Sequence, residues 1–294
     1  MTDTIAIIAP GEMGSAVGAR LADKGARVIT SLAGRSPASV QRAERARFTA
    51  VEGDDALVAQ ADLVMSILPP GDAVKLAQRL APALARATKK PTYVDCNAVS
   101  PQTAREIGTV LIGTGAAYVD AGIIGPPPQP SGTRTILYVA GEAASAVERL
   151  DCPALRVRVI DGPVGAASAL KMSYAGITKG FTAIGAMMML GAVRAGCGEA
   201  LHREMSESIP TLLAWLTRQV PRMYPKAYRW VAEMEEIAAF LDDDAAGPSC
   251  YEAMARFYER LAHEAAQDQP PADGELAQLT RFCDLIAEAQ RKTA

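Results

Sequence analysis

Two glycines near the N-terminus have the type and spacing that bind the diphosphate of a dinucleotide. Residues 9–14 read Ala-Pro-Gly-Glu-Met-Gly, the register of a G-x-G-x-x-G turn with alanine in its first position. Gly11 has no side chain, so the backbone can approach a diphosphate, and Gly14 lets the following helix pack closely on the strand. The free N–H groups at the start of that helix attract phosphate. We therefore predict that Gly11, Glu12, Met13 and Gly14 contact the cofactor.

Arg35 and Ser36 stand where a dinucleotide-binding chain reads the adenosine ribose. An acidic residue is expected about 20 residues after the glycines when the ribose carries a free 2′-hydroxyl. This chain has Gly34-Arg35-Ser36 there and no carboxylate. A guanidinium can form paired hydrogen bonds with a 2′-phosphate, and the serine hydroxyl can donate another. The sequence therefore predicts NADP rather than NAD, against the alternative that Arg35 is a solvated surface residue.

Alternating strand and helix patterns place both segments in a doubly wound parallel sheet. Residues 5–8 and 62–68 are apolar runs of the kind found in parallel strands that are covered on both faces. The other predicted strands are residues 28–30, 92–97, 118–121 and 135–140, and the predicted helices are residues 13–24, 40–47, 73–87, 101–111 and 143–150. Strands that alternate with helices indicate an α/β Rossmann fold.

Three loops follow directly on predicted strands of this sheet. They contain Leu68 and Pro69, residues 97–100, and residues 122–132. Ligands of doubly wound sheets bind at the carboxyl ends of the strands. We therefore predict that Leu68, Pro69 and Asn97 also contact the cofactor.

The pattern changes at about residue 162, where strand signals vanish and helical patterns continue to the end. We predict a dinucleotide-binding Rossmann domain over residues 1–162 and an all-helical domain for substrate binding and dimerisation over residues 163–294. Residues 166–195 read as one long helix, in which Gly176, Gly180 and Gly185 allow another helix to approach. An apolar helix of this length is covered by neighbouring helices or by a second subunit, which predicts a homodimer.

Composition argues against several other classes of protein. A net charge of −3 without a basic, aromatic cluster does not fit nucleic-acid binding. The five cysteines lack C-x-x-C spacing, so we expect neither structural disulfides nor a zinc site, as suits the cytoplasm. The two histidines, His202 and His263, are too far apart in the sequence for a metal site or a Ser-His-Asp triad to be expected. We expect no signal peptide, and the apolar run 181–193 is too short to span a bilayer.

Four segments, in the expected order, resemble the β-hydroxyacid dehydrogenase superfamily, which includes 3-hydroxyisobutyrate and 6-phosphogluconate dehydrogenases. The first is the turn at residues 11–14. Residues 95–101 (Asp-Cys-Asn-Ala-Val-Ser-Pro) are similar to the family's D-x-S-T-x-S-P, and residues 120–125 (Asp-Ala-Gly-Ile-Ile-Gly) are similar to D-A-P-V-S-G. Residues 162–171 (GPVGAASALK) are similar to G-x-x-G-x-G-x-x-x-K. The resemblance covers nearly the whole chain.

The resemblance implies a reaction and a site. Lys171 matches the family's catalytic lysine, which donates a proton to a carbonyl oxygen during reduction and, as a neutral amine, takes it back during oxidation. Tyr174 lies three residues on, on the same helix face, where it would either orient substrate or pack in the core. Asn97 and Ser100 are placed to hydrogen-bond substrate near the nicotinamide.

The chain also departs from the family's pattern. Ile124 stands where the family has a substrate-binding serine, next to Gly125, and prolines follow. That serine usually holds a substrate carboxylate, so the relatives' substrates do not transfer directly to this site. Arg134 is interpreted as a surface residue. Glu233 and Glu236 lie where relatives often carry a Lys-Asp pair, and we interpret them as part of a solvated face.

These observations favour an NADP-dependent oxidoreductase that acts on a small hydroxy or oxo compound, with Lys171 as general acid and base. An imine reductase of the same architecture is the first alternative. Lys171 argues against it, because imine reductases generally carry Asp or Tyr there, whereas Tyr174 and the apolar Ile124 leave it open. The second alternative is an NADP-binding redox sensor without turnover.

Overall fold

The computed structural model describes residues 3–131 and 135–292. The chain forms two compact units, of which the first ends at Met172 and the second begins at Ser173. The described strands all lie in the first unit and end at Val159, whereas the last long helix of that unit begins at Ala166 and continues into the second. The chain therefore changes from a sheet with helices to helices alone within residues 160–165.

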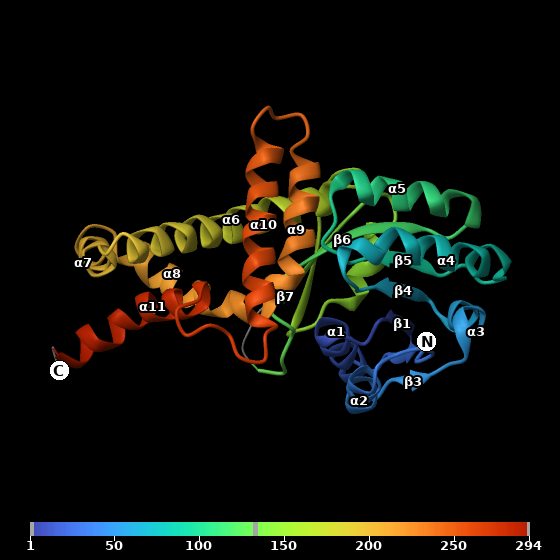
Figure 1. The fold of residues 1–294 in the computed structure, drawn as a ribbon. Coiled ribbons are helices and arrows are strands. Elements are labelled where there is room, and N and C mark those ends of the chain that lie inside the picture. The colour runs from blue at the N-terminus through green and yellow to red at the C-terminus, as the bar shows by residue number, and fades with distance from the viewer. Residues whose placement is uncertain (1–2, 132–134, 293–294) are drawn as a thin grey trace. The chain divides into compact units, whose positions relative to one another are not determined.

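The first unit is built on a mixed sheet (Figure 1). Its strands are β1 (Thr4–Ile8), β2 (Arg27–Thr30), β3 (Thr49–Ala50), β4 (Leu63–Ser66), β5 (Thr92–Asp95), β6 (Tyr118–Ile124), β7 (Thr135–Ala140) and β8 (Leu155–Val159). The order across the sheet is β3-β2-β1-β4-β5-β6-β7-β8, and among these described strands β6 and β7 pair antiparallel whereas the other neighbours pair parallel. The strand order reverses between β1 and β4, and ligands of such sheets bind outside this switch point.

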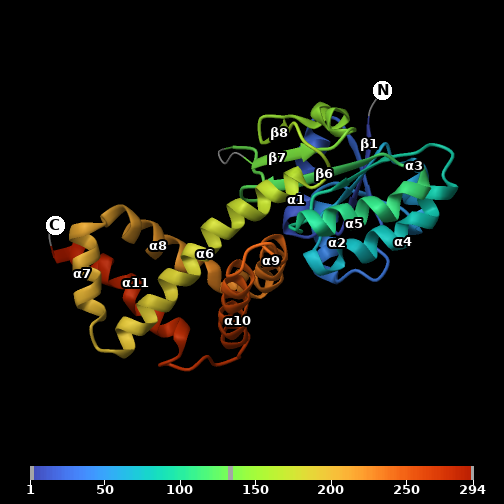
Figure 2. The same ribbon diagram turned by 90° about the horizontal axis from the view of Figure 1, so that it is seen from above.

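Helices cover both faces of the sheet, as the continuous apolar runs predict. They are α1 (Glu12–Asp23), α2 (Pro37–Arg45), α3 (Gly53–Gln60), α4 (Ala73–Arg86) and α5 (Pro101–Leu111), with 3₁₀ helices η1 (Pro70–Asp72), η2 (Ile112–Thr114) and η3 (Ala144–Leu150). Along β1, Ile5 and Ile7 enter one core cluster with α1 and η3, and Ala6 and Ile8 enter another with α3, α4 and α5. Helices α4 and α5 lie side by side (Figure 2). The predicted Rossmann fold is therefore confirmed.

The second unit is helical throughout its described residues. It contains most of α6 (Ala166–Arg194), followed by α7 (Gly198–Ser208), α8 (Pro210–Met223), η4 (Tyr224–Lys226), α9 (Ala227–Phe240), α10 (Gly247–Ala265) and α11 (Glu275–Lys292). Helices α9 and α10 pack side by side as a hairpin (Figure 1). The predicted all-α C-terminal region is confirmed.

The glycines of α6 lie where other helices press against it. A Cβ on Gly185 would stand 2.4 Å from Leu216 of α8, and one on Gly176 would stand 3.0 Å from the Tyr251 hydroxyl of α10. These contacts explain glycine at both positions in an otherwise apolar helix. By length and composition alone α6 could also cross a membrane, a property that core helices of soluble proteins share.

Candidate functional site

The turn between β1 and α1 has the geometry of a diphosphate-binding loop. Ala9, which replaces the first glycine of the fingerprint, has φ +63°, the left-handed region that glycine prefers. The Gly11 N–H donates to the Ala9 carbonyl at 2.7 Å. A Cβ on Gly14 would lie 2.6 Å from the same carbonyl oxygen, so internal packing requires glycine there.

Gly11 is not required by packing. It caps α1 with φ −72°, and a Cβ on it would meet only the Ala9 carbonyl oxygen, at 4.0 Å. No side chain caps the helix start, and Glu12 is exposed while Met13 packs partly on the core. A side chain at residue 11 would therefore fill open space beside the free N–H groups of α1. This space fits the diphosphate of a dinucleotide.

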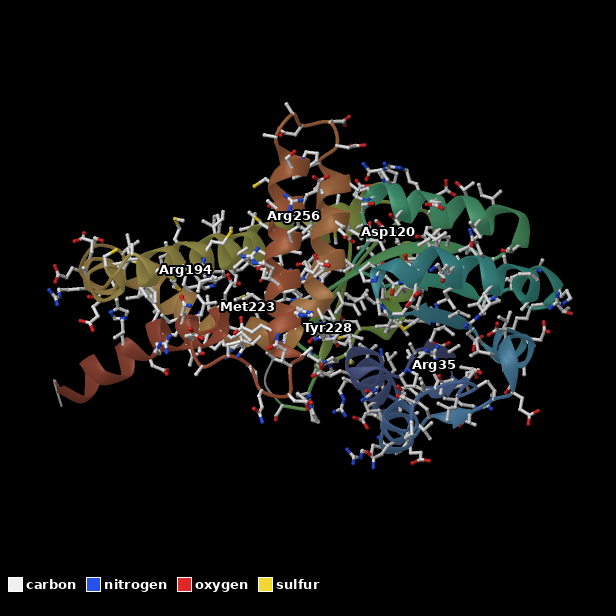
Figure 3. The ribbon with its side chains drawn as sticks, viewed as in Figure 1. Arg35, Asp120, Arg194, Met223, Tyr228 and Arg256 are labelled. Carbon is white, nitrogen blue, oxygen red and sulfur yellow. The ribbon has the colours of Figure 1, made fainter. Side chains whose placement is uncertain are left out.

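Arg35 and Ser36 lie between β2 and the start of α2. Ser36 is the N-cap of α2, and its Oγ accepts a hydrogen bond from the Ser39 N–H at 3.3 Å. Arg35 (Figure 3) is partly buried, directly precedes the N-cap of α2 and forms no ion pair among the described residues. The residues that were predicted to read the ribose thus form a cationic helix start without a local carboxylate.

Asn97 connects the carboxyl ends of β4 and β5. Its Oδ1 accepts from the Leu68 N–H at 2.7 Å, and its Nδ2 donates to Ser66 Oγ at 2.7 Å and to Asp95 Oδ1. The side chain is 2% exposed. Its described role is to fix the loop that carries Leu68 and the exposed Pro69, and a direct contact of Asn97 with a ligand stays a prediction.

Ser100 is fully buried at the start of α5. Its Oγ accepts from the Thr103 N–H at 3.2 Å and lies 3.0 Å from the Thr103 hydroxyl. In this conformation the side chain offers no exposed atom to a ligand. Its substrate contact stays a prediction, and the Ser-Pro pair of the motif is explained as a helix cap followed by proline in the first turn.

Asp120 of β6 fixes the start of α6. Its Oδ2 accepts from the N–H groups of Gly165 and Ala167, both at 2.9 Å, and of Ser168 at 3.1 Å, and its Oδ1 accepts from Ser168 Oγ at 2.6 Å. Burial raises the pKa of Asp120, and these hydrogen bonds oppose that rise. The anchor was not predicted, because its partners lie 45 to 48 residues away in the sequence.

Gly122 lets α6 lie directly on β6. A Cβ there would stand 3.0 Å from the Ala167 carbonyl oxygen and 3.0 Å from Cβ of Lys171. Lys171 is partly buried, and its Nζ donates to the Ile123 carbonyl at 2.8 Å. Since β5 and β6 are parallel, Ile123 belongs to the same strand-end edge as Asn97 and the loop after β4. The second and fourth motifs thus converge at the edge where α/β sheets bind ligands.

The neighbouring predicted residues are more exposed. Ile124 is partly buried, and Gly125 is exposed with φ +129°, a conformation that favours glycine. Tyr174 belongs to the second unit and is 51% exposed, so it does not pack in the core of the described chain. Arg134 lies outside the described residues.

The prediction that Glu233 belongs to a solvated face is wrong. Its side chain is 14% exposed and forms an ion pair with Lys179 of α6, whose Nζ also lies 5.2 Å from the centre of the Trp230 ring. The Tyr258 hydroxyl donates to the Lys179 carbonyl. The short-range pattern in α9 did not reveal a partner 54 residues away.

This turn, switch point and strand-end lysine define an NAD(P)-binding fold of the dehydrogenase type. Residues 4–153 match the family described as the NAD binding domain of 6-phosphogluconate dehydrogenase. Residues 192–261 match a domain of unknown function, DUF1932. The chain therefore belongs to the β-hydroxyacid dehydrogenase superfamily and has a C-terminal helical domain.

Solved structures share the whole architecture. A conserved protein of unknown function, described as structurally similar to 3-hydroxyacid dehydrogenases, is 25% identical with a TM-score of 0.66, over 90% of this chain and 100% of its own. The Mycobacterium tuberculosis 3-hydroxyisobutyrate dehydrogenase, in a structure with L-serine, is 18% identical with a TM-score of 0.72, over 96% and 99%. An Aspergillus terreus reductive aminase, in a complex with NADPH and ethyl levulinate, is 17% identical with a TM-score of 0.57, over 96% and 100%. No curated protein matches the chain.

Proposed function

We propose that the protein is an NADP-dependent oxidoreductase that transfers a hydride between the nicotinamide and a small hydroxy or oxo compound, with Lys171 as general acid and base. The observation that carries this proposal is the Lys171 ammonium bonded to the Ile123 carbonyl at 2.8 Å. Residues 1–162 bind the cofactor in this proposal, and residues 163–294 bind substrate and a second subunit.

Different residues of the first unit bind different parts of the cofactor in this proposal. Gly11 leaves open space at the start of α1, where the free N–H groups bind the diphosphate. Glu12, Met13 and Gly14 form the first helical turn beside it. The bound dinucleotide supplies the hydride donor or acceptor. Asn97 keeps the loop of Leu68 and Pro69 in place through the Leu68 N–H.

Arg35 and Ser36 give the preference for NADP over NAD. Arg35 has no carboxylate partner among the described residues, and α2 has no acidic residue in its first turn. The start of α2 therefore favours an anion, and a 2′-phosphate is the anion that distinguishes the two cofactors.

Lys171 moves the proton. One hydrogen bond from Nζ to the Ile123 carbonyl orients the amine of Lys171. Among the described residues no carboxylate pairs with this amine, so its other N–H groups are available to a substrate oxygen. As an ammonium it donates to the oxygen during reduction, and as a neutral amine it accepts during oxidation. In this proposal Ile124 and Gly125 lie beside this oxygen, and the substrate contacts of Asn97, Ser100 and Tyr174 are further predictions.

An imine reductase is the second candidate function. Imine reductases and reductive aminases share this architecture, and one from Myxococcus stipitatus was solved with NAD⁺. The apolar Ile124, in place of a carboxylate-binding serine, favours it, and Lys171 argues against it. An NADP-binding redox sensor remains the alternative without turnover, and the loss of that serine motivates it.

A second copy of the chain covers the exposed apolar face of α6 in this proposal. The side chains in question recur at a spacing of three and four residues and are half exposed: Tyr174 51%, Ile177 58%, Phe181 55%, Ile184 46% and Met188 62%. This 3.5-residue period is typical of paired helices. A cavity of about 620 Å³, lined by Ile177, Phe181 and Trp215, lies beside them. The protein is also cytoplasmic in this proposal, because its five cysteines lack C-x-x-C spacing.

Two measurements test the proposal. A panel of aldehydes, keto acids, hydroxy acids and cyclic imines is mixed with the protein and NADPH or NADP⁺, and the absorbance of NADPH is followed. Turnover of carbonyl compounds supports the proposal, turnover of imines alone supports the second function, and no turnover of any class supports the sensor.

Lys171→Ala then tests the proton carrier. We expect turnover to fall by about 10²- to 10⁴-fold, the usual contribution of a general acid, with NADPH affinity unchanged. Lys90→Ala is the matched control, because Lys90 also donates to backbone carbonyls, of Leu84 and Ala85, at the end of α4. Near-normal turnover in Lys171→Ala would remove this residue from the mechanism.

A further inference from the structure

Arg42 links the diphosphate turn to the start of α2. Its Nε donates to the Pro10 carbonyl at 3.1 Å, and its Nη2 donates to Ser39 Oγ at 3.0 Å. Pro10 belongs to the turn before α1, and Ser39 lies in the first helical turn of α2. One guanidinium therefore contacts both the predicted diphosphate turn and the helix start that is predicted to read the ribose.

The charge of Arg42 has no partner in the described chain. Its side chain is part-buried, and both acceptors that it reaches are neutral oxygens. A cation that gives up water for neutral partners loses free energy unless an anion completes its surroundings. Arg35, a few residues away in the sequence, likewise has no ion pair among the described residues. Arg35 thus lies directly before α2, and Arg42 reaches back from the last turn of α2 to its first turn, both without an ion pair among the described residues.

The hydrogen bonds of Ser39 leave its proton free. Its Oγ accepts from Arg42 Nη2 and from the Ser36 hydroxyl, at 3.0 Å and 3.1 Å. A hydroxyl accepts two hydrogen bonds and donates one, so both acceptor positions are filled. The Ser39 proton has no acceptor among the described residues and is available to a ligand. A phosphate oxygen is an acceptor that suits a hydroxyl with a guanidinium beside it.

We infer that Arg42 is a specificity-determining residue for the 2′-phosphate of NADP. It adds a second positive charge to that of Arg35 and holds the Ser39 hydroxyl as a donor. Through Pro10 it also ties this phosphate site to the diphosphate turn. The inference rests on the NADP preference proposed above.

Arg42→Met tests the inference in the full-length protein. Dissociation constants for NADPH and NADH are measured by calorimetric titration, together with adenosine 2′,5′-bisphosphate and adenosine 5′-phosphate, which differ only in the 2′-phosphate. We expect the NADPH constant to rise about tenfold, as for the loss of one charge-assisted hydrogen bond, and the NADH constant to stay within about twofold. Arg45→Met is the control, because Arg45 lies exposed on the same helix.

The outcomes separate this inference from the proposal beneath it. Equal affinities for NADPH and NADH in the unmodified protein would overturn the NADP assignment and this inference together. If the unmodified protein prefers NADPH but Arg42→Met weakens both cofactors equally, Arg42 is only a structural brace and the inference alone fails. Ser39→Ala gives a second reading if Arg42→Met does not fold: we expect about a threefold loss confined to NADPH, and an unchanged preference would overturn the inference.

Discussion

Helices α1 and α6 both begin in the first unit, and their first N–H groups are satisfied in opposite ways. At α6, the buried carboxylate of Asp120 accepts from the N–H groups of Gly165, Ala167 and Ser168. At α1, Gly11 caps the helix without a side-chain hydrogen bond, and the Ser15 hydroxyl donates to the Gly11 carbonyl. One helix start is closed by the protein's own anion, and the other is open.

This difference shows that one helix start positions a side chain, whereas the other is available to bind a ligand. A helix start exerts the same attraction on an anion in both places. At α6 the Asp120 carboxylate bonds to the helix N-terminus and fixes the helix on the sheet. This contact positions Lys171 next to Ile123. At α1 no side-chain cap is described at Gly11, and the open space beside this residue leaves the attraction for a ligand.

The largest expected effect comes from opening the closed helix start. Asp120→Ala removes the acceptor of four hydrogen bonds and leaves buried N–H groups unsatisfied. We expect the free energy of unfolding, measured in urea, to fall by about 3 kcal/mol. Asp120→Asn keeps one carbonyl acceptor and should lose about half as much. A stability within about 0.5 kcal/mol of the original in Asp120→Ala would show that other contacts hold α6.

Local patterns predicted most of the fold. The strands from β1 to β7 that carry continuous apolar runs were found because both faces of the sheet are covered. Strand β8 was missed, because Arg156 and Arg158 alternate with apolar residues at an edge whose exposed face needs no apolar side chain. The helix predicted at residues 143–150 is the 3₁₀ helix η3. These errors fall where tertiary position, rather than local pattern, decides the structure.

The site was predictable only as far as its contacts are local. The turn at Gly11 and Gly14 was found because its chemistry lies within six residues. The hydrogen bonds between Asp120 and α6 and between Arg42 and Pro10 join residues that are at least 32 positions apart. No local sequence pattern predicts such bonds. The Lys179–Glu233 pair was missed for the same reason. Asn97 was chosen as a ligand contact by its position at a strand end, but its side chain is used to hold the neighbouring loop.

The next effect comes from closing the open helix start. Gly11→Val puts a side chain into space where the nearest atom to its Cβ is 4.0 Å away, so we expect stability to change by less than about 1 kcal/mol. The valine occupies the diphosphate space, and NADPH affinity should fall about a hundredfold, as measured by titration.

Gly14→Ala is the matched comparison, and it should behave in the opposite way. Its Cβ would stand 2.6 Å from the Ala9 carbonyl oxygen, so the helix must shift and stability should fall by about 1–3 kcal/mol. Unchanged NADPH binding in a folded Gly11→Val variant would contradict the assignment of this helix start to a ligand.

The smallest expected effect on stability concerns Asp95, a buried carboxyl that does not bond to a helix N-terminus. Asp95 lies beside Asp120 on the neighbouring strand, and only Oδ1 has a hydrogen-bond partner, Asn97, among the described residues. Burial raises the pKa of Asp95 to about 7. The folded protein then holds a proton that the unfolded chain releases near pH 4. The contribution of this group to the free energy of unfolding is therefore complete below pH 4 and is lost as the pH rises to 7.

Asp95→Asn resembles the protonated carboxyl at every pH and should remove this slope. Between pH 5 and pH 8 we expect the original protein to lose about 2 kcal/mol more stability than Asp95→Asn, as measured by urea unfolding at each pH. Asp120, which is compensated by α6, should contribute a smaller slope, because its hydrogen bonds favour the charged form. If the free energy of unfolding depends on pH in the same way in both proteins, Asp95 is already ionised at pH 5. Asn97 alone would then compensate its charge as fully as a helix start does for Asp120.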